Sequence, residues 1–136
     1  MNYFDITNET LKPYREYENY VLYCIDTKNK SAGIEFIFDF ANEQVSYYGQ
    51  IINEALKTAF EEYGLQKVYV NVVRDNFKMF YILEKFNFIT VAIHRGQYFD
   101  GTMHDVVYMT VLKHEWQLGG IRYNFKYDKY AIETKR

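Results

Sequence analysis

Two carboxylates, Glu35 and Asp39, lie in segment 33–40, which is rich in β-branched and aromatic residues. Side chains alternate along an extended strand, so both residues are expected on the same face. Paired carboxylates make a negative surface that favours a cationic partner such as an ammonium group, and a carboxylate can also accept a proton in catalysis. The alternative interpretation of Glu35 is an outward charge that protects an edge strand.

Three histidines, His94, His104 and His114, raise the question of a metal site. If a hairpin loop over residues 96–101 is symmetric, His94 and His104 lie opposite each other on paired strands. Two histidines leave a metal ion short of ligands, and no cysteine accompanies them. We therefore predict no metal centre.

The composition predicts one ordinary globular domain. The chain has 136 residues, with 49% hydrophobic, 25% charged and 20% aromatic residues, and a formal net charge of −2. Such a slightly acidic chain is not expected to bind nucleic acid or an anionic membrane, and no apolar run is long enough to span a bilayer.

The one cysteine, Cys24, lies in an apolar run and is interpreted as a buried structural thiol. With no secretory signal pattern in the first residues, we expect a cytoplasmic protein.

The elements that must position these residues form an α+β pattern. Strands are predicted at 3–7, 20–26, 33–40 and 67–73, with a closing hairpin of 88–95 and 103–112; helices are predicted at 52–63, before Gly64, and from Asp75 or Asn76 to Phe86, before Asn87. This order predicts a mixed sheet with helices packed on it. Residues 1–118 are expected to form the domain, and the Tyr-rich and Lys-rich residues 119–136 a C-terminal extension.

Several segments, taken in order, resemble one known family. They are residues 53–60 with 64–72, the pair Asp75-Asn76 with Leu83-Glu84-Lys85-Phe86-Asn87-Phe88, and residues 95–100 with 105–109 and Trp116. Their order and spacing resemble the later two thirds of the GNAT superfamily of acyl-CoA-dependent N-acetyltransferases. The resemblance implies a GNAT-like mixed central sheet flanked by helices. It also implies transfer of an acetyl group from acetyl-CoA, as co-substrate, to a primary amine of a small molecule or protein.

The resemblance also implies positions for the coenzyme. A strand that includes Phe38 holds the pantetheine arm, and a helix start at Gly49, Gln50 and Ile51 receives the pyrophosphate. The phosphate-loop match needs a one-residue insertion and has only one of the usual glycines, so Gly49 is alternatively a simple helix start. Asn76 either bonds to the pantetheine arm or caps the following helix.

The resemblance assigns catalytic roles as well. Glu35 takes the proton of the incoming amine, and Asp39 adds negative charge to the acceptor pocket. The tyrosine that usually protonates the leaving thiolate is replaced by Leu83, which cannot donate a proton. Its replacement is either Tyr108 or water.

A second class of function remains open, because two motifs depart from the family pattern. In this alternative the chain is a catalytically inactive GNAT-fold module for binding or assembly. A homodimer is expected in both cases, because residues 122–128 alternate aromatic and polar side chains, as an added or exchanged strand does. The alternative for residues 119–136 is a disordered end.

Overall fold

The computed structural model describes residues 13–38 and 45–118. The elements in chain order are β1 (Arg15–Glu16), β2 (Tyr20–Asp26), β3 (Ser31–Phe36), α1 (Val45–Lys57), the π-helix η2 (Thr58–Glu62), β4 (Lys67–Val73), α2 (Phe77–Lys85), β5 (Ile89–Phe99) and β6 (Thr102–Leu112). A further helix covers residues 113–118. The strand predicted at 3–7 and the extension 119–136 lie outside the described residues.

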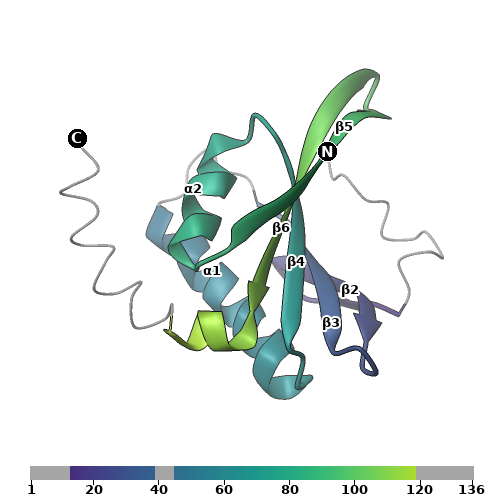
Figure 1. Cartoon of the computed structure of the whole chain (residues 1–136). Coiled ribbons are helices and arrows are strands. Elements are labelled where there is room, and N and C mark those ends of the chain that lie inside the picture. The colour runs from purple at the N-terminus through teal and green to yellow at the C-terminus, as the bar shows by residue number, and fades with distance from the viewer. Residues whose placement is uncertain (1–12, 39–44, 119–136) are drawn as a thin grey trace.

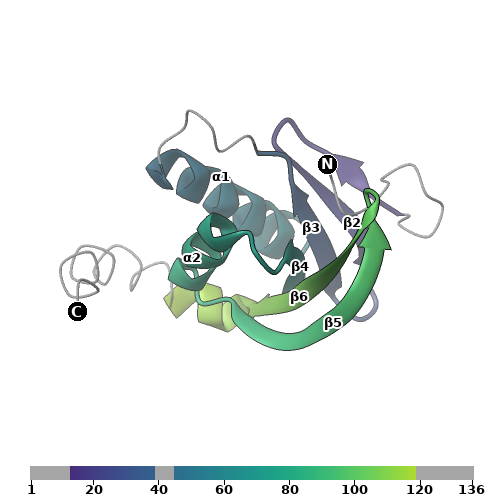
Figure 2. The same ribbon diagram turned by 90° about the horizontal axis from the view of Figure 1, so that it is seen from above.

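The strands form one mixed sheet in the order β1-β2-β3-β4-β6-β5. Only β3 and β4 are parallel, and the other neighbouring pairs are antiparallel. The connection between the parallel strands runs through α1 and η2, and α1 and α2 both lie on one face of the curved sheet (Figures 1 and 2). The predicted α+β architecture with a mixed sheet is confirmed.

The core lies between that face and the helices. Val68, Val70 and Val72 of β4 are buried, which is the alternation predicted for this strand. Leu22 and Ile34 extend the same layer onto β2 and β3. The opposite face of the sheet is not covered by α1 or α2, and we call it the open face. It carries the predicted catalytic residues Glu35 and Tyr108. Among the described residues, no helix is both long and apolar enough to span a membrane.

Helix α1 starts earlier than predicted. The expected start was residue 52, whereas α1 begins at Val45. Its buried residues follow the spacing of one helix face and include Tyr48, Ile51, Ile52 and Ala55. The apolar face therefore reaches back into the segment expected to form a phosphate loop, and Gly49 lies inside the helix. The helix end predicted at residue 63 is correct to within a residue, since η2 ends at Glu62. Gly64, just beyond it, has φ 66, the left-handed conformation that commonly ends a helix.

The closing hairpin is also longer than predicted. Residues 96–99 were expected in the loop, but β5 continues to Phe99 and the turn consists of Asp100 and Gly101. Both have positive φ, 55 and 80, as a tight two-residue hairpin turn requires. The hairpin extends well beyond the rest of the sheet (Figure 1).

Candidate active site

The two parallel strands separate halfway along their length. Pairing of β3 with β4 covers only residues 31–33 and 67–69, and it ends at Gly33 and Tyr69. Beyond that point β4 continues beside β6 to Val73, while β3 stays with β2. The result is a V-shaped opening between residues 34–36 and 70–73, which we call the wedge; its vertex is the Gly33–Tyr69 pair.

Main-chain groups face into the wedge from β3. The Ile37 N–H points away from the wedge, since it donates to the Asn19 carbonyl at 2.9 Å. Main-chain groups alternate in direction along a strand. The Ile34 C=O and both main-chain groups of Phe36 therefore point toward β4 beyond the last β3–β4 pair, whereas the Ile34 N–H points to Tyr69 at the vertex.

The β4 side of the wedge has the same character. The Arg74 N–H donates to the Asp105 carbonyl at 2.9 Å, so the main chain of Arg74 faces β6. By alternation, the main-chain groups of Asn71 and Val73 face the wedge. The wedge thus presents hydrogen-bond donors and acceptors from both strands, and a ligand carrying amides could pair with them as an extra strand does.

Aromatic side chains cross the open face beside the vertex. Tyr23 of β2 and Tyr69 of β4 have ring centroids 5.9 Å apart at an interplanar angle of 88°. Tyr69 is 5.3 Å from the Tyr108 ring on β6, and Tyr108 is 6.3 Å from the His94 ring on β5. We call Tyr23, Tyr69 and Tyr108 the tyrosine row.

Gly33 makes this arrangement possible. A Cβ at position 33 would lie 2.4 Å from Tyr23 Cζ and 2.7 Å from Tyr69 Cε1. The two rings therefore fill the space above β3 that a side chain would occupy. From there Tyr23 reaches β4, where Asn71 Nδ2 donates to the Tyr23 hydroxyl at 3.3 Å.

The tyrosine row holds its protons at neutral pH. Burial raises the pKa of Tyr23 well above its ordinary value, and the negative charge of Glu35 raises it further, against the hydrogen bond from Asn71, which lowers it. Burial also raises the pKa of Tyr69 and of Tyr108. These three hydroxyls therefore stay protonated at neutral pH, and the Tyr23 side chain is only 2% exposed.

Glu35 and Tyr108, both predicted as catalytic, lie on the open face but on different strands. Glu35 is half-buried on β3, beside the wedge and close enough to Tyr23 to influence its pKa. Tyr108 pairs with Asn71 across β4 and β6, on the far side of β4 from the wedge. Asp39 lies outside the described residues.

The predicted coenzyme residues fall in different places. Phe38 is half-buried on the helix side, with ring centroids 5.2 Å from Phe36 and 4.7 Å from Tyr48. Gly49 and Ile51 are buried in the second turn of α1, and Gln50 is exposed there. The expected location of Gly49, Gln50 and Ile51 at a helix start is wrong, because α1 already begins at Val45 within the described residues.

Asn76 caps a helix, which was one of its two interpretations. Its Oδ1 accepts a hydrogen bond from the Met79 N–H at 3.3 Å at the start of α2. At the other end Asn87 has φ 69, the left-handed conformation predicted for a C-terminal cap. Leu83, between them, has 0% exposure and belongs to the core.

The histidines do not form the predicted pair. The turn lies at Asp100 and Gly101 rather than over residues 96–101, so the register from the turn places His104 opposite Gln97. A register shift between His94 and Gln97 then places His94 opposite Val106. His104 instead stacks on Phe99 at 4.3 Å. Over residues 13–38 and 45–118, no three His, Cys, Asp or Glu residues are grouped to hold a metal ion.

Cys24 is less buried than predicted. The pairing of β2 with β3 shifts register between Tyr23 and Asp26, and Cys24 in that irregular stretch has φ 51. Because the irregularity interrupts the alternation of the strand, the side chain is half-buried rather than enclosed in the core. Its thiol contacts the Tyr69 hydroxyl.

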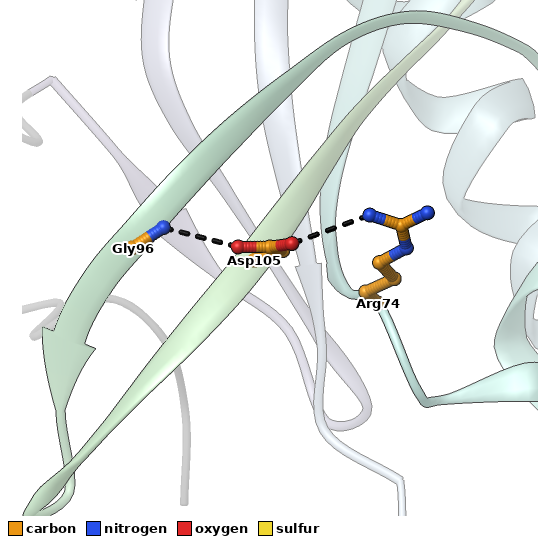
Figure 3. A network of polar contacts seen from close by, with 3 residues as sticks. All are labelled: Arg74, Gly96 and Asp105. Carbon is orange, nitrogen blue, oxygen red and sulfur yellow. Dashed lines mark hydrogen bonds and ion pairs between the residues drawn. The ribbon is translucent and has the colours of Figure 1, made fainter.

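A polar contact fixes the hairpin near the end of β4. Asp105 accepts hydrogen bonds from the Gly96 N–H at 3.0 Å and from Arg74 Nη1 at 3.2 Å (Figure 3). The Gly96 hydrogen bond, assisted by Arg74, lowers the pKa of the Asp105 carboxyl. Beside it lies a groove of about 390 Å³, lined by Val73, Arg74, Asp75, Phe77, Met103, His104 and Asp105.

Residues that the sequence interpretation missed are Tyr23, Asn71 and Gly33. The signal for Gly33 was available, because a glycine opposite a tyrosine in a predicted hairpin indicates a close approach. The contact of Tyr23 with Asn71 joins residues 48 positions apart, on strands that are not neighbours in the sheet. No local pattern in the sequence indicates it.

The mixed sheet, the separated parallel strands and the helices on one face define the fold of the GNAT N-acetyltransferases. The chain matches no protein-family model and no curated protein. Among solved structures it is similar to spermidine N-acetyltransferase from Vibrio cholerae in complex with CoA and spermine, with TM-score 0.66 and 24% identity over 72% of this chain and 59% of that one. It is also similar to the dodecameric form of that enzyme in an intermediate state, with TM-score 0.65 and 23% identity over 71% and 57% of the two chains. The chain thus spans less than two thirds of the length of these enzymes.

Proposed function

We propose that the protein is an acetyl-CoA-dependent N-acetyltransferase that moves an acetyl group to a primary amine. The wedge carries this proposal, because it is an opening between two parallel strands that presents main-chain groups from both sides. The similarity to a solved N-acetyltransferase bound to CoA supports the choice of ligand.

The pantetheine arm of acetyl-CoA contains two amides, which we propose pair with the main-chain groups of residues 34–36 in the wedge. The inward N–H of Phe36 then polarises the thioester carbonyl. Phe38 packs along the arm on the helix side. The pyrophosphate binds near the start of α1, whose first-turn N–H groups have no partner within the helix, and Gln50 in the next turn contributes its exposed amide.

The amine approaches from the open face. Glu35 takes a proton from the incoming ammonium, directly or through water, and Asp39 adds negative charge to the acceptor pocket. The amine nitrogen then bonds to the thioester carbon, and the C–S bond breaks as the electron pair leaves with sulfur. Tyr108 is the proton donor proposed from the sequence for the leaving thiolate.

The acceptor is proposed to be a cationic amine, since the structural relative is a spermidine acetyltransferase and Glu35 supplies negative charge. We also propose that the protein acts as a homodimer in the cytoplasm. The dodecameric relative supports assembly, and the thiol of Cys24 suits a reducing compartment.

Calorimetry with acetyl-CoA, with free coenzyme A as a comparison, tests the proposal. We expect binding at micromolar strength and thiol release when spermidine or propylamine is added. Glu35→Gln should bind acetyl-CoA normally while turnover falls about 10²-fold or more. The exposed Glu84→Gln is the matched control and should leave both unchanged. If millimolar acetyl-CoA produces no binding heat and no thermal stabilisation, the proposal is contradicted. That result would favour an inactive module.

A further inference from the structure

We propose that residues 122–128 of a second copy of the chain add to the outer edge of β5 as an antiparallel strand. The inference rests on the proposed homodimer, and it identifies the segment and the sheet edge that form the interface. It is independent of acetyl transfer.

The outer edge of β5 carries the inference. Over residues 13–38 and 45–118, β5 pairs with β6 alone, so its other side has no neighbouring strand there. Residues 89–96 are all exposed. Residues 89–93 carry no charged side chain, whereas natural proteins commonly protect a free sheet edge with charged residues or proline. The bulges of β5 restrict which strands can pair with it, but they leave its apolar side chains uncovered.

The segment 122–128 has the sequence of a strand that can cover this edge. Its aromatic residues alternate with polar or charged ones, so an extended segment has one aromatic face. Aromatic and β-branched side chains form favourable cross-strand pairs. Ile93 is such a partner, because it lies opposite the buried Val107 and is itself exposed. Arg122 and Lys126 would then place charge on the new edge of the sheet.

The described part of the chain ends close to the beginning of β5. The helix over residues 113–118 directly follows β6, and Asn87 Nδ2 donates to the Glu115 carbonyl at 3.2 Å. Asn87 lies two residues before the first residue of β5. Figure 2 shows this helix beside the start of the strand. Residue 118 is therefore near the end of the sheet at which β5 begins.

The length of the link assigns the segment to a second copy. Residues 119–121 span at most about 10 Å. Strand β5 has 11 residues and is about 36 Å long. A segment of the same chain would therefore start beside the beginning of β5 and run parallel to it. Parallel pairing is the less stable kind and is typical of sheets covered on both faces, whereas β5 is exposed on both. A segment from a second copy can approach from the far end and pair in the antiparallel direction.

Phe125→Pro in the full chain tests the inference, because proline has no N–H and breaks a strand ladder. Light scattering after size-exclusion chromatography measures the mass, and hydrogen exchange measures the protection of β5 amides. We expect a wild-type dimer with protected β5 amides. In Phe125→Pro the dimer dissociation constant should rise by about tenfold or more, and β5 exchange should become faster by a similar factor.

Two further variants serve as controls. Thr134→Pro places the same residue outside the segment, and Phe125→Tyr keeps the alternation of aromatic and polar side chains. Both should behave as the wild type in mass and in β5 exchange.

The other outcomes overturn the inference in distinguishable ways. A dimer that Phe125→Pro leaves unchanged in mass and exchange would show that β5 pairs with something other than this segment. Faster β5 exchange without a change of mass would show that the segment pairs within its own chain. A monomeric wild type would contradict the proposed homodimer itself.

Discussion

At the scale of single residues, Gly33 connects the fold with the site. Its φ is not in the left-handed region, so a glycine is not needed here for backbone conformation. What requires glycine is space, since the rings of Tyr23 and Tyr69 occupy the position of a side chain. The absence of a Cβ therefore lets a residue of β2 reach β4 across an intervening strand.

Gly33→Ala should destabilise the protein by about 1–3 kcal/mol, because both rings must shift to admit a methyl group. Urea unfolding measures the loss. In a Tyr23→Leu variant, Gly33→Ala should destabilise the protein less, since one of the two rings is absent. An identical cost in both backgrounds would show that ring crowding is not the cause.

Leu83→Tyr restores the residue type that the family resemblance expects but should not restore a proton donor. Leu83 has 0% exposure, so a larger, polar side chain strains the core and lowers the free energy of unfolding by about 1–3 kcal/mol. Leu83→Met, which conserves volume, should cost under about 1.5 kcal/mol. Thiol-release assays should show no gain in turnover for Leu83→Tyr, and a clear gain would contradict this account.

At the scale of elements, the hairpin of β5 and β6 is fixed by Asp105. The lowered pKa of this carboxyl means that its ionised form is stabilised in the folded protein. Its contribution is present above the ordinary aspartate pKa of about 4 and is lost as the pH falls through the lower folded value. Because the contacts join β5, β6 and the residue after β4, acid should loosen the hairpin relative to the sheet.

Asp105→Asn should therefore flatten the acid limb of the stability curve. The urea midpoint of the wild type should fall more steeply between about pH 5 and pH 2 than that of the variant. Asp26→Asn is the comparison variant, because hydrogen bonds within the turn after β2 also lower the pKa of Asp26. This variant should likewise flatten the acid limb of the stability curve, but it should leave the hairpin of β5 and β6 unaffected. Hydrogen exchange of β5 amides distinguishes the two. Parallel curves for wild type and Asp105→Asn would contradict the assignment.

The elements could be predicted where local patterns mark them. Alternating valines give β4 its observed bounds, and the helix-capping residues Asn76 and Asn87 bracket α2. The start of α1 was not predicted, because Gly49 suggested a boundary that burial of Tyr48 overrides. The β5 bulges and the contact of Tyr23 with Asn71 depend on partners distant in sequence, so no local pattern reveals them.

At the scale of the whole molecule, β5 leaves one edge of the sheet open within the described residues. Ile89, Val91 and Ile93 are 55%, 55% and 46% exposed on this edge strand. Long apolar edge strands tend to pair with other chains, and bulges such as those in β5 restrict the geometry of that pairing. The proposed homodimer therefore has an edge on which it can form.

The double variant Ile89→Lys and Ile93→Lys should shift the protein toward monomer, because two charges on the edge oppose pairing. Size-exclusion chromatography with light scattering measures the mass. Gln66→Lys with Gln117→Lys adds the same charge at exposed polar positions elsewhere and should leave the assembly unchanged. Loss of assembly in both double variants would point to net charge rather than to β5.

The lone tryptophan of the sequence gives the molecule an intrinsic optical probe. Trp116 is 8% exposed, its ring centroid is 5.4 Å from that of Phe60, and its indole N–H donates to Asn53 Oδ1 at 3.0 Å. An enclosed indole emits at shorter wavelength than a hydrated one, so a red shift should follow unfolding. The contacts tie the fluorophore to α1 and η2 rather than to the tyrosine row. A change in emission on adding acetyl-CoA would therefore report a signal transmitted through the helix layer.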